Sequence, residues 1–168
     1  MADVRNGRWL RVTRLDLIHS ARTAIAACIS LEIARVLKLP EAYWAAITTL
    51  IVMQSTLGAA LTVSGQRFAG TALGCAMGAL LVTYFPSSIL LFTAGVFVLG
   101  LVCAALRLDR AAYRFAGITL AIVMLVDRAK PAYVIAAHRF IEVSVGIAIG
   151  LVLTAVWPEP EPANVYGR

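Results

Sequence analysis

Six apolar stretches, each close to the length that crosses a lipid bilayer, make up most of this 168-residue chain. About 20 consecutive apolar residues in a helix span the hydrocarbon core of a membrane. The sequence therefore predicts an all-α membrane protein with six transmembrane helices. The predicted helices are Leu17–Leu37, Tyr43–Leu61, Gln66–Phe85, Ser87–Leu106, Ala111–Val126 and His138–Trp157.

The composition agrees with lipid as the main solvent. Hydrophobic residues make up 61% of the chain and charged residues 14%, against roughly 45–50% and about 25% in soluble domains. Short polar loops separate the stretches, so we expect each helix to run antiparallel to the one before it. We expect a basic juxtamembrane segment at residues 1–16, one six-helix domain at 17–157 and a disordered Pro/Glu tail at 158–168.

The basic residues predict the orientation, because Lys and Arg in short loops favour the cytoplasmic side. With the N-terminus inside, nine basic residues fall on the cytoplasmic side and five on the other. We therefore expect both termini in the cytoplasm. The arginine-rich run at 8–14 suits anionic lipid better than nucleic acid, because the same cluster serves as the orientation signal.

The two halves of the chain resemble each other. A shift of 72 residues lays Gln66–Pro86 over His138–Pro158 with seven of 21 positions identical. A shift of 71 lays Ile47–Met53 over Ile118–Met124 with five of seven identical. Apolar helices often look alike, but ordered matches at Arg, Gly and Pro favour a true duplication.

Each repeat, roughly 17–86 and 87–157, would hold three helices. An odd number of helices makes the second half enter the membrane from the opposite side. The expected architecture is therefore two inverted three-helix repeats. Such repeats recur in secondary transporters, with the substrate site near the middle of the membrane where the halves meet.

Glycines at four-residue spacing predict two close helix contacts, because residues four apart share one helix face. The helix-packing candidates are Gly70, Gly74, Gly78, Gly146 and Gly150. Glu142 takes the place that matches Gly70 in the repeat. We expect it on the packing face, one turn from Arg139, with which it can pair.

Polar side chains within the apolar stretches are the candidates for a substrate pathway, because a charge at the bilayer centre costs at least about 2.5–3.5 kcal/mol. Arg67 and Arg139 stand at predicted helix starts, where they either snorkel to the interface or serve the pathway. Arg22 lies deeper and favours a functional or coupling role. The other candidates either link helices by hydrogen bonds or belong to the pathway: His19, Trp44, Thr48, Gln54 and Glu142.

Three sequence blocks carry a resemblance to a known family. They are His19-Ser20-Ala21-Arg22-Thr23, the run from Glu41 to Ala59 with its Tyr-Trp-Ala…Thr…Val-x-Gln pattern, and the Arg-x-x-Gly-Thr-x-x-Gly block within Gln66–Gly74. The chain resembles the transmembrane domain of the fusaric acid resistance and aromatic acid exporter superfamily over most of residues 17–157.

The resemblance implies an exporter of aromatic carboxylates and other organic anions in the bacterial inner membrane. Plant malate-permeable anion channels share a similar six-helix domain. The resemblance also implies that Arg22, Arg67 and Arg139 offer positive charge to a carboxylate. It further implies that Trp44 and Thr48 line the passage. Family members commonly carry two such domains and this sequence shows one, so we expect a homodimer or a higher homo-oligomer.

The sequence leaves three functions open. The leading one is a transporter of small organic or aromatic carboxylates, and the alternatives are a passive organic-anion channel and a non-transporting scaffold or accessory subunit. The expected partners are the lipid bilayer and an organic anion, without nucleic acid, cofactor or metal. We do not expect an enzyme, because the sequence contains no metal-binding His/Cys cluster, G-x-S-x-G turn or phosphate-binding glycine loop.

Overall fold

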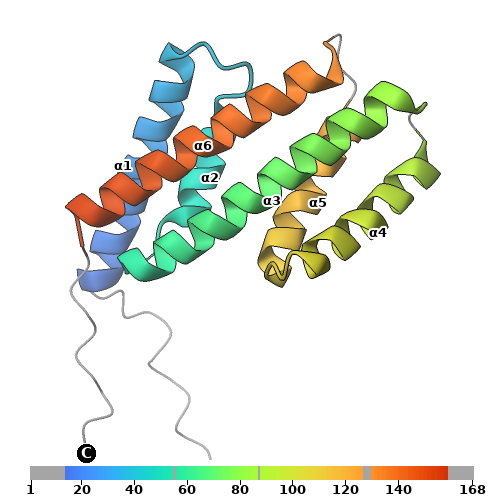
Figure 1. Ribbon diagram of the computed structural model, residues 1–168. Coiled ribbons are helices and arrows are strands. Elements are labelled where there is room, and N and C mark those ends of the chain that lie inside the picture. The colour runs from blue at the N-terminus through green and yellow to red at the C-terminus, as the bar shows by residue number, and fades with distance from the viewer. Residues whose placement is uncertain (1–13, 55, 87, 127–129, 159–168) are drawn as a thin grey trace, which may run out of the picture.

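A computed structural model describes residues 14–54, 56–86, 88–126 and 130–158 (Figure 1). Over these ranges the chain forms six α-helices and no strand. They are α1 (Arg14–Val36), α2 (Tyr43–Val52), α3 (Leu57–Tyr84), α4 (Ile89–Ala105), α5 (Arg110–Leu125) and α6 (Ala132–Val156). The predicted basic segment and Pro/Glu tail fall almost wholly outside the described residues, although Arg14–Asp16 begins α1.

Three of the helices are long and apolar enough to cross a membrane: α1 over Asp16–Val36, α3 and α6. Helices α2 and α4 are shorter apolar helices, and α5 has 16 residues. At 1.5 Å per residue, the ten residues of α2 extend about 15 Å, half of a roughly 30 Å hydrocarbon core. The structure therefore supports the predicted all-helical class. Of the six predicted membrane spans, it supports three.

The predicted boundary between the second and third helices is wrong. We expected a break at residues 62–65, but α2 already ends at Val52, and Met53 is extended with φ −61° and ψ 111°. Helix α3 then runs without a break from Leu57 through Gly65 to Tyr84. One glycine within a helix costs only about 1 kcal/mol, which is too little to end a helix that packs against several others.

Helices α3 and α6, the two longest, lie side by side across the middle of the molecule (Figure 1). Helices α1 and α2 pack against α6, and α4 and α5 pack against α3. The contact between α3 and α5 is the most extensive of all, and α6 packs closely on α2. Each long helix therefore rests on a short helix from the other half of the chain.

Glycines bring these backbones together. A Cβ atom at Gly74 of α3 would meet the main-chain oxygen of Ala116 and, at 2.7 Å, the Cβ of Thr119. A Cβ atom at Gly146 of α6 would meet the main-chain oxygen of Ala45 and, again at 2.7 Å, the Cβ of Thr48. The other three glycines make comparable contacts: Gly70 with Ala112, Gly78 with Val123 and Gly150 with Val52.

Helices α1 and α4 end in the same way. Lys38 and Arg107 each adopt φ 54° just past the helix. The N–H of the next residue then donates a hydrogen bond back to a carbonyl of the helix. Leu39 N–H donates to the Ala34 carbonyl at 3.0 Å, and Leu108 N–H donates to the Cys103 carbonyl at 2.9 Å. This is the left-handed C-terminal cap that glycine usually forms, here carried by basic residues that also suit the negative end of the helix dipole.

Candidate functional site

Helices α3 and α6 each carry one buried arginine. Arg67 follows the start of α3 at Leu57 by ten residues, and Arg139 follows the start of α6 at Ala132 by seven. Each is only 2% exposed. Our placement of both residues at helix starts is therefore wrong, and so is the snorkelling alternative, because neither side chain reaches the molecular surface.

Each buried guanidinium lies over an aromatic ring from the other half of the chain. The Cζ atom of Arg139 is 3.3 Å from the centre of the Trp44 ring on α2. The Cζ atom of Arg67 is 4.7 Å from the centre of the Phe115 ring on α5. A desolvated cation gains about 2 kcal/mol from such a ring face, so both charges are stabilised without being neutralised.

Glu142 supplies the carboxylate nearest to Arg139. One oxygen, Oε1, accepts a hydrogen bond from the Glu41 main-chain N–H at 2.9 Å, just before α2 begins. The other, Oε2, lies 3.9 Å from Arg139 Nη1. The predicted pairing of these two side chains is therefore loose, and Glu142 also ties α6 to the start of α2.

Arg139 retains unused hydrogen-bonding capacity. Its three guanidinium nitrogens are buried, and none makes a hydrogen bond within the described part of the chain. A buried charged donor without partners is costly. The geometry therefore suits a ligand that brings acceptor oxygens to this guanidinium.

Arg67 is held by a hydroxyl instead of a carboxylate. Its Nη2 donates to Thr48 Oγ1 at 3.3 Å. Across the described ranges no carboxylate lies within ion-pair distance of Arg67, although its charge acts on Arg139. The sequence predictions for Arg67, Arg139, Trp44 and Thr48 thus fall on one connected group of side chains.

A cavity of about 310 Å³ adjoins this group. It lies beside the start of α2 and the first turns of α6, and Arg139 faces it. The residues that line it are Pro40, Glu41, Lys130, Ile135, His138, Arg139 and Glu142. Among the described residues, Arg67, Lys130 and Arg139 stand against Glu41 and Glu142, a balance that favours an anion.

Three of the predicted pathway residues lie apart from this group. Arg22 is fully buried, but it donates to two main-chain oxygens, Gln54 O and Trp157 O, each at 2.7 Å. The side-chain amide of Gln54 donates back to Ile51 O at 3.1 Å within its own segment. His19, near the start of α1, is partly exposed, and none of the three lines the cavity.

The sequence reading missed Phe115 and Glu41. Phe115 lies 71 residues after Trp44, the same shift that aligns Ile47–Met53 with Ile118–Met124, so the repeat carried a signal for it. Glu41 fixes Trp44 by accepting its indole N–H at 3.1 Å. A single glutamate in a loop gives no such signal in a sequence.

Taken together, the apolar helices and the aromatic-covered arginines define a helical membrane protein with a buried cationic centre. The chain belongs to the fusaric acid resistance protein family, whose profile matches residues 16–165. Several proteins that the chain resembles carry names that describe them as transporters or as an inner membrane protein.

Relatives from Escherichia coli and Salmonella typhimurium are described as the uncharacterized transporter YdhK. The chain is 30% identical to the protein of Escherichia coli K12 over 170 residues, which cover 96% of this chain and 25% of the relative. It is 31% identical to that of Salmonella typhimurium, covering 92% of this chain and 24% of the relative. The chain thus spans about a quarter of the YdhK proteins.

A further relative is described as the inner membrane protein YeeA of Escherichia coli K12. It is 27% identical over 149 residues, which cover 85% of this chain and 41% of the relative. No solved structure matches the chain. The relatives support a location in the inner membrane.

Proposed function

We propose that this protein moves small organic or aromatic carboxylates outward across the inner membrane. The observation that carries the proposal is Arg139: its guanidinium is buried, faces a cavity of about 310 Å³ and has no hydrogen-bond partner among the described residues. A carboxylate offers two oxygens to an arginine fork, which is among the strongest pairings in proteins.

The six helices act, in this proposal, as two inverted three-helix repeats. The glycine contacts support it, because Gly74 meets Ala116 and Thr119 just as Gly146 meets Ala45 and Thr48. So do the arginine–aromatic pairs. The centre of such a repeat is where transporters hold their substrates.

The proposal includes six membrane-crossing segments, cytoplasmic termini and a homo-oligomer. The basic-residue count supports the orientation, and α4 exposes a large apolar face, with Phe97 66% and Leu101 56% exposed. That face suits either lipid or a second copy. Mass measurement of the detergent-solubilised protein by light scattering tests the oligomer.

Purified protein in lipid vesicles tests transport. Release of preloaded 4-hydroxybenzoate at pH 8 should exceed release from protein-free vesicles, and Arg139→Gln should reduce it to that baseline. Arg35→Gln, which changes an exposed arginine, is the matched control. Correctly folded wild-type protein that releases no more than empty vesicles would support a scaffold or accessory subunit instead. A release rate that does not change when a pH gradient is imposed would favour a passive channel.

A further inference from the structure

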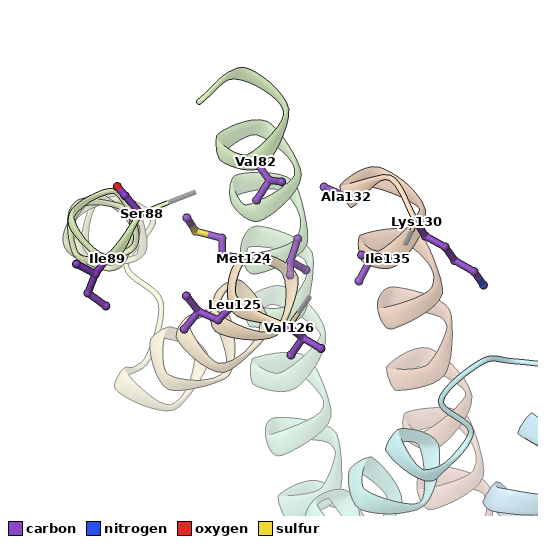
Figure 2. A pocket seen from close by; sticks show the side chains of 10 residues that line it. Val82, Ser88, Ile89, Met124, Leu125, Val126, Lys130, Ala132 and Ile135 are labelled. Atoms are coloured by element: carbon purple, nitrogen blue, oxygen red, sulfur yellow. The ribbon is translucent and has the colours of Figure 1, made fainter. Parts of the chain in front are cut away.

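A second cavity, of about 460 Å³, lies where α3 and α5 end and α4 and α6 begin. Among the described residues, the side chains that line it are apolar except for those of Ser88 and Lys130, and they include Val82, Met124 and Ile135. Figure 2 shows the amine end of Lys130 directed away from Val82 and Met124. The side chains beside Val82 and Met124 can therefore contact an apolar group.

Ile135 stands between this apolar cavity and the cavity at Arg139. It lines both of them. Ile135 precedes Arg139 by four residues and, like Arg139, is buried on α6, so the two side chains lie one turn apart on the same helix face. One turn rises about 5.4 Å, a distance that a small carboxylate with a ring bridges.

We propose that the apolar cavity is the subsite for the apolar body of the substrate, and that Ile135 sets the size of body accepted. This rests on the proposed function, because it places the carboxylate of the same molecule on Arg139. Removing the body from water favours binding. A small acid without an apolar body gains nothing from this cavity, so the pair of cavities favours carboxylates that carry one.

Competition binding tests this subsite with the full chain in detergent at pH 8, where the acids are ionised. Labelled 4-hydroxybenzoate is displaced by 4-tert-butylbenzoate or by malonate. Wild-type protein should prefer 4-tert-butylbenzoate to malonate. Ile135→Trp should lower the affinity for 4-tert-butylbenzoate, relative to that for 4-hydroxybenzoate, by roughly tenfold or more, because a larger side chain crowds the pocket. Ile135→Ala should raise the ratio of these two affinities.

Ile141 offers the matched control, because it is an isoleucine on the same helix with 44% of its surface exposed. Ile141→Trp and Ile141→Ala should leave the ratio unchanged. If Ile135→Trp does not fold, the affinity ratio of Ile135→Ala alone tests the subsite, because this variant only removes atoms and does not crowd the helix packing.

The outcomes separate the two proposals. Protein that binds none of these acids contradicts the proposed function. Protein that binds them, but whose Ile135 variants change all affinities equally or not at all, overturns the subsite and leaves the function standing. That second result would mean that the apolar cavity does not take part in binding these acids.

Discussion

The guanidinium of Arg139 lies over the indole ring of Trp44, with 3.3 Å between Cζ and the ring centre. The indole is itself fixed, because its N–H donates to Glu41 Oε2 at 3.1 Å. Helix α2 therefore presents an anchored aromatic face to the buried cation of α6. Any ligand that binds Arg139 meets a guanidinium whose orientation Trp44 has already set.

Replacing Trp44 should weaken carboxylate binding more than it weakens the fold. Trp44→Leu removes a cation–π contact of about 2 kcal/mol, so 4-hydroxybenzoate affinity should fall about 10- to 30-fold. Trp44→Phe keeps a ring and should lose less. Tyr43→Leu, at a neighbouring position that is 50% exposed, is the control. Equal affinity in all four proteins would show that Trp44 does not orient Arg139.

Removing the charge of Glu142 should destabilise the protein. Glu142→Gln keeps an oxygen for the Glu41 N–H but leaves Arg139 without its nearest carboxylate, at a cost of about 3 kcal/mol or more. The double variant Arg139→Gln/Glu142→Gln should recover stability without recovering transport. Thermal unfolding in detergent measures the first effect, and vesicle release measures the second.

Glu32 supplies the control for that experiment. Its Oε1 forms an ion pair with Arg35 Nη1 at 2.7 Å, and both side chains are at least 60% exposed. Surface pairs contribute about 0–1 kcal/mol, so Glu32→Gln should change the unfolding temperature little. If Glu32→Gln lowered the unfolding temperature as much as Glu142→Gln, burial of Glu142 would not explain the effect of removing its charge.

The glycine contacts should not accept even one methyl group. In Gly74→Ala and Gly146→Ala the new Cβ would meet a backbone oxygen and, at 2.7 Å, a threonine Cβ, so the helices must separate. Overpacking of this kind costs about 1–3 kcal/mol or more. Gly117→Ala has open space around it and should stabilise α5 by about 0.5–1 kcal/mol. Thermal unfolding compares the three, and equal unfolding temperatures would contradict the tight packing.

The sequence predicted the long-range features better than the local ones. Glycines four residues apart mark one helix face wherever the helix begins, so the faces of Gly74 and Gly146 could be predicted without exact helix bounds. The depth of Arg67 depends on where α3 begins. The break at Met53 has no proline or glycine beside it, so the sequence carried no local signal, and Arg67 was placed too near the surface.

The role of Arg22 could not be read from the sequence, because the partners that the structure describes for it are main-chain atoms. A buried charge in an apolar helix predicts a need for a partner, but not which one. Here the partners are the carbonyls of Gln54, after α2, and Trp157, after α6. Carbonyls at helix C-termini carry partial negative charge and no side-chain signature.

Arg22 should therefore matter for the assembly of α1, α2 and α6 more than for the substrate. Each of its 2.7 Å bonds is a charge-assisted hydrogen bond of about 1.5–3 kcal/mol. Arg22→Gln should lower the unfolding temperature strongly, and Arg22→Lys should lower it less because an ammonium still reaches one carbonyl. In Arg22→Lys the affinity for 4-hydroxybenzoate should stay within about twofold of wild type, because Arg22 does not line the cavity at Arg139. Loss of binding with unchanged stability would return Arg22 to the substrate pathway, as the family resemblance implied.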